Sequence, residues 1–298
     1  MHLLPNDGDA VNVRLIDVPY TAGDDRHPAS RGGRALLNAG AADLIERQGV
    51  AVSVEHVTRA GPFRDTASSS ADVNRGLAAA VRRAVEGAEL PVVVAGSCPA
   101  AHGVLAGFDH SRCGALWLDA HGDFNTPESS ISGFFPGMSL AVLVGHCYRA
   151  YWEQIGHATP VAEDAVALLG VRDLSPEAER ERLARSAVQV VPWADGRPQG
   201  DIEATLDGLA QRVRDVYLHL DIDVFDPAVA PGVVDEPVAG GMSLEDAEGV
   251  VRAAAARFRF RAATIATFTP GRDHGDVTLR TALRVMELLA EWARNAAA

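Results

Sequence analysis

Two stretches of the sequence are the strongest indicators of the fold. They are Leu116-Trp117-Leu118-Asp119-Ala120-His121-Gly122-Asp123 and Leu218-His219-Leu220-Asp221-Ile222-Asp223. Each stretch begins as a short apolar run and ends in acidic residues at alternate positions. Apolar runs of this length predict strands that are covered on both faces of a parallel sheet. Ligands bind beyond the carboxyl ends of such strands, so both stretches predict a strand that leads into a functional site.

The same alternation of strands and helices extends outward along the chain. Short β-branched runs predict strands over residues 11–17, 50–57, 91–95, 114–119, 165–171, 188–191, 216–221 and 263–268. Stretches with a helical period predict helices over residues 34–48, 71–87, 100–108, 137–151, 176–186, 201–214, 243–257 and 276–295. Residues 61–70 look like a loop. The pattern predicts a single-domain, three-layer α/β/α fold over residues 1–298, with a mostly parallel sheet of about eight strands.

The composition excludes several classes of protein. The 298 residues contain 27 Lys and Arg against 40 Asp and Glu, a net charge of −13, without the basic clusters that nucleic acids require. No apolar run reaches the roughly 20 residues of a membrane helix, so no membrane partner is expected. Met1–Ala10 lacks the apolar core of a signal peptide, and the three cysteines form no CxxC pair. These features predict a cytoplasmic protein.

Five ionisable side chains follow the two strands that decide the fold. Asp119, His121 and Asp123 alternate, and Asp221 and Asp223 repeat the same spacing. Alternate side chains of an extended backbone share one face, so the five groups can converge. Because they would repel one another, they predict a pair of divalent cations, with Mn²⁺ as the natural candidate. The alternative is that these acids cap loops or helix N-termini.

A resemblance to a known family rests on DAHGDFNTPESSISG (119–133) and LDIDVFDPAVAPG (220–232). Both segments resemble signature segments of the arginase/agmatinase superfamily, the ureohydrolases. The resemblance implies a parallel eight-stranded sheet and a binuclear manganese centre. It also implies hydrolysis of a guanidino group with release of urea, and assembly into homo-oligomers, either trimers or hexamers.

The resemblance also implies which residues hold the metals. It makes Asp119 and Asp221 bridging ligands, with Asp123 completing one ion's shell and His121 and Asp223 completing the other's. In Ala95-Gly96-Ser97-Cys98-Pro99, Cys98 stands where the family usually has a histidine ligand. A thiolate ligand would make Fe, Co or Zn possible beside manganese. Alternatively, Cys98 is a small buried apolar residue.

The implied chemistry is attack by a metal-bridging hydroxide on a linear amidino-type carbon–nitrogen bond. Asp123 would act as general acid and base, handing a proton to the departing amine. Asn125, Ser130 and Ser132 match positions that bind the substrate carboxylate in arginases. Ordinary loop capping explains these three residues equally well.

Three departures from the family pattern concern the substrate. Pro136 stands in place of a proton-shuttling histidine, Ser175 in place of an aspartate, and Thr267 in place of a glutamate that faces the guanidinium. A modified, less basic substrate is therefore expected: an N-hydroxyguanidine, a substituted amidine or a formimino compound. Two alternatives stay open: a catalytically lapsed member that binds metal or a metabolite without turnover, and a structural subunit of a hetero-oligomer.

Overall fold

A parallel eight-stranded sheet forms the middle layer of the protein. The structure is a computed structural model that describes residues 11–21, 26–156, 159–235 and 237–296. The strand order is β2-β1-β3-β10-β9-β4-β5-β6. The strands are β1 Asn12–Val18, β2 Val52–His56, β3 Glu89–Ala95, β4 Cys113–Leu118, β5 Val166–Leu169, β6 Gln189–Val191, β9 Asp215–Asp221 and β10 Arg259–Ala266.

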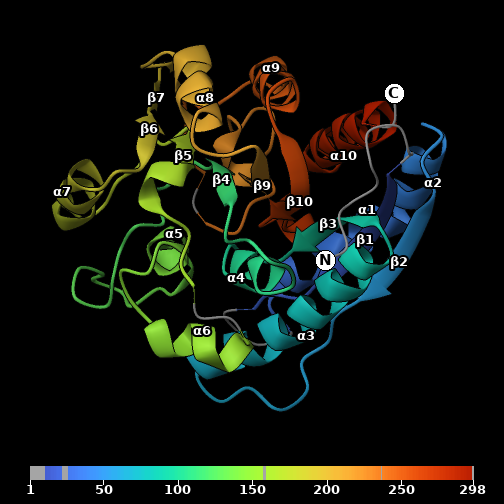
Figure 1. Cartoon of the computed structure of the whole chain (residues 1–298), viewed down its shortest axis with the longest axis horizontal. Coiled ribbons are helices and arrows are strands. Elements are labelled where there is room, and N and C mark those ends of the chain that lie inside the picture. Colours follow the sequence, from blue (N-terminus) through green and yellow to red (C-terminus); the bar gives the residue numbers. More distant parts are fainter. Residues whose placement is uncertain (1–10, 22–25, 157–158, 236, 297–298) are drawn as a thin grey trace.

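Helices cover both faces of the sheet, and each face has its own buried core. One layer contains α1 Gly32–Asn38, α2 Ala41–Glu46, α8 Ile202–Ala210, α9 Leu244–Ala255 and α10 Val277–Asn295. The other contains α3 Thr66–Glu86, α4 Ala100–Leu105, α5 Ser139–Leu143, α6 Arg149–Ile155 and α7 Glu177–Arg185. Figure 1 shows α8, α9 and α10 on one side of the sheet and α3, α5 and α6 on the other. The three-layer α/β/α prediction is confirmed.

The eight predicted strands are all present, whereas two predicted helices are broken. The helix expected over residues 34–48 is interrupted at Gly40, whose φ of +85° is left-handed. The helix expected over 137–151 stops after Leu143, ahead of Gly145 with a φ of +85°. Helix α6 begins only after Tyr148, which has a φ of +53°. Left-handed residues cannot continue a right-handed helix, so the chain turns at both points.

The loop expected over residues 61–70 is wrong in its second half. Helix α3 begins at Thr66 because the Asp65 carboxylate accepts a hydrogen bond from the Ser68 backbone N–H, at 2.9 Å. A short hairpin, β7 Trp193–Ala194 and β8 Arg197–Pro198, was not expected. Its turn is Asp195-Gly196, both with positive φ, which is a common two-residue hairpin sequence.

The middle of the sheet brings four strand ends together. Ala95 of β3 pairs with Ala266 of β10, which pairs with Asp221 at the end of β9. On the other side of β9, Leu220 pairs with Leu118 at the end of β4. The segments that follow β3, β4, β9 and β10 therefore meet at one edge of the sheet.

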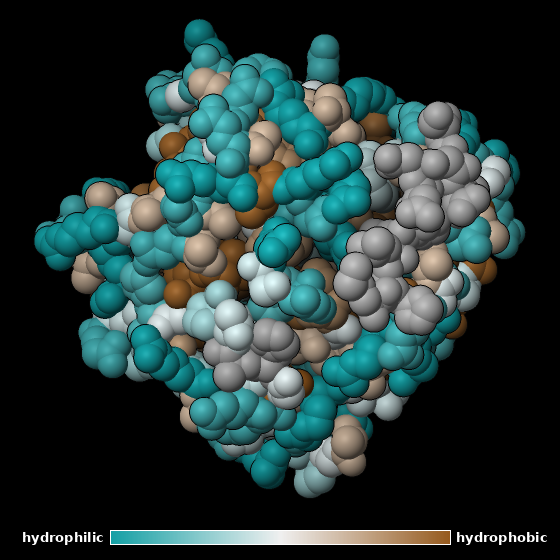
Figure 2. Space-filling model, viewed as in Figure 1, coloured by the Kyte–Doolittle hydropathy of each residue, from teal (hydrophilic) through white to brown (hydrophobic). Residues whose placement is uncertain are grey.

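The surface is largely hydrophilic on the face drawn in Figure 2, where apolar residues show mainly in recesses. None of the helices within the described residues is both long and apolar enough to span a membrane. The expectation for Met1–Ala10 concerns residues outside the described ranges.

Candidate metal centre

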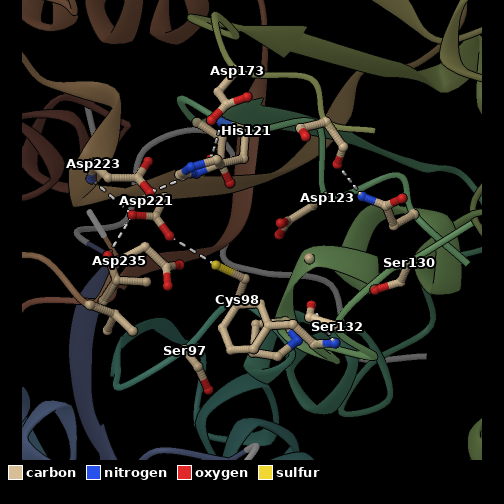
Figure 3. Close-up of a pocket in the computed structure, with 18 of the residues that line it drawn as sticks. Ser97, Cys98, His121, Asp123, Ser130, Ser132, Asp173, Asp221, Asp223 and Asp235 are labelled. Carbon is tan, nitrogen blue, oxygen red and sulfur yellow. Dashed lines mark hydrogen bonds and ion pairs between the residues drawn. The ribbon is translucent and has the colours of Figure 1, made fainter. Parts of the chain in front are cut away.

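A cavity of about 300 Å³ opens at the carboxyl ends of the central strands (Figure 3). Every site residue predicted from the sequence lines it: Cys98, Asp119, His121, Asp123, Asn125, Ser130, Ser132, Asp221, Asp223 and Thr267. These side chains come from loops after four different strands, so the sheet order alone brings them together.

One half of the centre is formed by Asp119, His121 and Asp223. Each offers one ligand atom, and the three atoms lie within 4.8 Å of one another. His121 Nδ1 lies 2.9 Å from an Asp223 oxygen and 3.5 Å from an Asp119 oxygen. Burial alone would lower the pKa of His121, but the two carboxylates raise it well above its usual value. In the absence of a cation, the imidazole therefore carries a proton that balances these acids.

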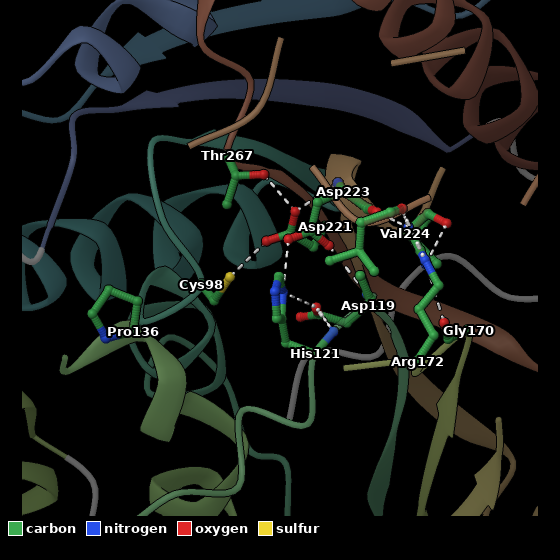
Figure 4. A network of polar contacts seen from close by, with 12 residues as sticks. Cys98, Asp119, His121, Pro136, Gly170, Arg172, Asp221, Asp223, Val224 and Thr267 are labelled. Carbon is green, nitrogen blue, oxygen red and sulfur yellow. Dashed lines mark hydrogen bonds and ion pairs between the residues drawn. The ribbon is translucent and has the colours of Figure 1, made fainter. Parts of the chain in front are cut away.

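The other half is formed by Cys98, Asp119 and Asp221, with His219 beside them. Their ligand atoms also lie within 4.8 Å of one another. The Cys98 thiol donates to an Asp221 oxygen at 2.8 Å, and Thr267 donates to the other oxygen of the same carboxylate (Figure 4). Burial, followed by the nearby charges of Asp221 and Asp123, raises the pKa of the Cys98 thiol. The thiol can lose its proton once a cation replaces it.

Asp123 completes the ring of acids from the far side of the cavity (Figure 3). Its φ of +49° is left-handed, and its backbone oxygen accepts from the backbone N–H groups of Leu140 and Ala141 in the first turn of α5. Its side-chain oxygen Oδ2 is buried and has no hydrogen-bond partner among the described residues. Burial and the charge of Asp119 raise the pKa of this carboxyl. A strained backbone and an unpaired buried oxygen mark a functional position.

Local hydrogen bonds hold the acids in their orientations. Asp119 accepts from the His121 backbone N–H, and Asp221 accepts from the Asp223 backbone N–H, both at 2.8 Å. The indole of Trp117 donates to the second Asp119 oxygen at 3.0 Å. The capping interpretation therefore holds for one oxygen of Asp119 and one of Asp221, and both carboxylates also belong to the groups of ligand atoms.

The donor set fits a pair of divalent cations. Asp119, Asp123, Asp221 and Asp223 are all buried within one cavity, which is too costly to keep ionised without positive charge. Burial and Asp223 raise the pKa of Asp119 to about 6. The unpartnered Asp123 Oδ2 is the clearest sign of a missing ligand. These residues can hold two cations, and Asp119 belongs to both groups of ligand atoms.

The predicted substrate residues lie toward the cavity mouth. Asn125 is buried and donates to the Ser175 backbone oxygen at 3.0 Å. Ser130 and Ser132 accept from the backbone N–H groups of Gly133 and Phe134, so loop capping occupies part of each hydroxyl. Their substrate role stays a prediction.

Sequence reasoning missed four functional candidates. Glu179 and Asp235 also line the cavity, and His219 belongs to the Cys98 half. Arg172 donates to five backbone oxygens, those of Gly170, Asp223, Val224, Phe225 and Val238. Arg172 thereby fixes the loop after β9 (Figure 4). His219 lies two residues before Asp221 in the strand, so both side chains lie on the same face of the sheet. The sequence alone could have indicated this.

This α/β/α fold gathers acids and imidazoles at its central strand ends, a set of side chains that could hold divalent metal ions. Comparisons with known proteins agree: the model described as the arginase family matches residues 11–291. The arginase of Bacillus caldovelox is 30% identical over 289 residues, 92% of this chain and 96% of that one. An arginase structure from Bacillus subtilis superposes with a TM-score of 0.85, at 30% identity, over 95% of this chain and 98% of that one.

The chain belongs to the arginase family, so the resemblance seen in the sequence is confirmed. It is an enzyme of the amidinohydrolase type that acts on carbon–nitrogen bonds, in a family that depends on a binuclear metal centre. The N(omega)-hydroxy-L-arginine amidinohydrolase of Streptomyces lavendulae is 32% identical over 165 residues, 55% of each chain.

Proposed function

We propose that this enzyme hydrolyses the guanidino or amidino group of a modified arginine-like compound and releases urea or a related product. Two divalent cations would be held by Cys98, Asp119, His121, Asp123, Asp221 and Asp223. The observation that carries the proposal is the convergence of these six side chains in one cavity. Bound cations would supply a hydroxide nucleophile at neutral pH, because they lower the pKa of water.

Asp123 is the residue we assign to proton transfer. Its carboxyl points into the cavity (Figure 3), its Oδ2 has no hydrogen-bond partner among the described residues, and burial and Asp119 raise its pKa. A carboxyl in this state can take a proton from a nucleophile and give it to a departing nitrogen. Pro136 cannot transfer a proton, so Asp123 would carry this role without a neighbouring histidine.

The substrate side of the cavity favours a modified guanidine. Thr267, which stands at the guanidinium position, uses its hydroxyl on Asp221 and brings no charge. Asp235 lies in the cavity wall, where burial raises the pKa of its carboxyl. We infer that Asp235 faces the nitrogen-bearing head group. Asn125, Ser130 and Ser132 would bind the carboxylate end of the substrate.

The native metal is proposed to be manganese, and Cys98 widens the choice to Fe, Co or Zn. Cys98→His is expected to increase the manganese content of protein purified from mixed-metal medium. Mass spectrometry of the metals measures this. Identical metal contents in both proteins would argue against ligation by Cys98.

The test of the function is release of urea and ammonia by the manganese-loaded enzyme. The panel contains L-arginine, N-hydroxyarginine, agmatine, guanidinobutyrate and formiminoglutamate, with Asp221→Ala as the control. We expect turnover of a modified guanidine, absent in the control, and a higher KM in Asp235→Asn. Stoichiometric metal without turnover of any compound would instead favour the lapsed member that binds without catalysis.

We also propose a homo-oligomer, a trimer or hexamer, as the family resemblance implies. Light scattering measures the mass of the assembly against the 31.4 kDa chain. A monomer at micromolar concentration would contradict this assignment.

A further inference from the structure

His219 is a buried histidine that the proposed metal pair, as described above, leaves without a role. It lies in β9, two residues before Asp221, and it is fully buried. Its ring stacks on the indole of Trp117 in β4, with ring centroids 3.7 Å apart and an angle of 17°. The stacking fixes the plane of the imidazole, because Trp117 pairs directly with His219 across the two strands.

Only one nitrogen of this imidazole has a partner among the described residues. Nδ1 lies 2.9 Å from the Tyr217 hydroxyl, whereas Nε2 is buried and unpaired. If Nδ1–H donates to Tyr217, Nε2 carries a free lone pair, the state in which histidine binds metals. Buried polar atoms without partners are rare, and an absent ligand explains this one.

The position of the ring identifies the ligand. A ring nitrogen of His219, the Cys98 sulfur and oxygens of Asp119 and Asp221 lie within 4.8 Å of one another. Four donors at this spacing can surround one cation. The opposite half, formed by Asp119, His121 and Asp223, contains no sulfur.

We propose that His219 is a ligand of the cation on the Cys98 side of the centre. This position then has one thiolate, one imidazole and two carboxylates, a donor set that favours Zn²⁺, Co²⁺ or Fe²⁺ over Mn²⁺. The opposite position, with carboxylates and one imidazole, suits Mn²⁺. The two halves would therefore select different metals. This inference rests on the proposed metal pair and adds a ligand and a metal preference to it.

The test is titration of metal-free enzyme with Co²⁺, followed by visible absorption and metal analysis. Wild-type enzyme is expected to bind two cations and to show a thiolate-to-cobalt charge-transfer band. In His219→Gln, affinity at the Cys98 position is expected to fall at least tenfold, with a changed visible spectrum, while the other position still fills. If His219→Gln binds both cations as tightly as the wild type and shows the same visible spectrum, the inference is overturned.

His102→Gln is the matched control. His102 is also fully buried, and it also has an unpaired nitrogen, Nδ1, but it lies outside both groups of ligand atoms. The His102→Gln variant should bind both cations as the wild type does. A wild type that binds no metal would overturn the proposed function itself. A wild type that binds two while His219→Gln is unaffected would overturn only the role of His219.

X-ray absorption of wild-type enzyme loaded with one Zn²⁺ per chain gives an answer that does not depend on how the variants fold. The inference predicts sulfur and imidazole in the shell of the same zinc ion. A shell with sulfur and no imidazole, or with no sulfur, would contradict it.

Discussion

Asp221 is the side chain on which the contacts of the cavity converge. One of its oxygens accepts from the Cys98 thiol, and the other accepts from the Thr267 hydroxyl and the Asp223 backbone N–H. Burial and the charges of Asp223 and Asp119 raise the pKa of its carboxyl. A cation that binds here therefore competes with protons for this carboxylate.

The Asp221→Ala variant tests whether metal binding can be lost without loss of stability in the metal-free protein. The variant should lose retained metal and activity together, because both cations would share this carboxylate. Metal-free stability should not fall in parallel, since the substitution removes a buried acid beside other acids. Thermal unfolding with and without Mn²⁺ measures both effects. If Mn²⁺ stabilises this variant as much as it stabilises the wild type, the bridging role of Asp221 is contradicted.

Glu179 makes stability dependent on pH. Its carboxylate accepts from the backbone N–H groups of Phe124 and Ser175, yet burial raises its pKa from 4.5 to about 7. A raised pKa in the folded state favours the protonated form. The contribution of Glu179 to the free energy of unfolding is therefore fully present below pH 4.5 and is lost as the pH rises through 7.

The size of this effect follows from the shift. Between those two values, metal-free wild type should lose about 3 kcal/mol more stability than Glu179→Gln, which stays neutral. Urea unfolding at several pH values, with chelator present, measures the difference. Parallel pH profiles of the two proteins would show that Glu179 ionises normally in the fold.

At the scale of elements, Arg172 joins the loop after β5 to the loop after β9. Its planar guanidinium donates to five backbone oxygens at 2.8–3.2 Å. Two of those oxygens belong to Asp223 and Val224, in the turn that presents a predicted metal ligand. Lysine has a compact ammonium with three donors, so it cannot reproduce this arrangement.

Arg172→Lys is expected to cost about 2–3 kcal/mol of stability and to weaken metal binding, because buried carbonyls lose charged donors. Arg185→Lys is the control. Arg185 pairs with Glu181 on the exposed surface of α7, so its replacement should change stability by less than about 0.5 kcal/mol. Chemical unfolding and metal titration of both variants test the difference. Equal effects would show that the guanidinium geometry is unimportant.

The strands and the acidic ligands were predictable from local sequence, and the helix breaks were not. Strands covered on both faces read as apolar runs, and alternation placed Asp119, His121 and Asp123 on one face. The second break runs from Gly145 to Tyr148, and tyrosine rarely adopts the left-handed backbone that it has there. The spacing of His219 and Asp221 places both on one face of a strand, but only the sheet order β3-β10-β9-β4 brings Cys98 and Trp117 to His219.

At the scale of the whole molecule, the metal centre lies where the central strands of the sheet end. Because the loops after β3, β4, β9 and β10 all contribute to it, a bound cation connects segments from both halves of the chain. Binding to the folded state alone stabilises the fold by mass action.

Removal of metal should therefore lower the melting temperature of the whole enzyme in one transition. At cation concentrations 1,000 times Kd, each bound cation contributes about 4 kcal/mol, or about 5–10 °C for a chain of this size, and two cations contribute about twice as much. Calorimetry before and after dialysis against chelator, followed by readdition of Mn²⁺, measures the change. A melting temperature unaffected by chelator would argue against a metal that binds the folded chain.

The indole of Trp117, which stacks on His219, should report metal binding through a change in its fluorescence. Trp117 is fully buried, contacts His219 with its face, and donates its Nε1–H to Asp119. It therefore contacts His219, the ligand proposed for the Cys98 side alone, and Asp119, the ligand proposed for both cations. Co²⁺ arriving there should quench its emission, whereas Zn²⁺ should not. Stopped-flow fluorescence can then resolve the order in which the two positions fill.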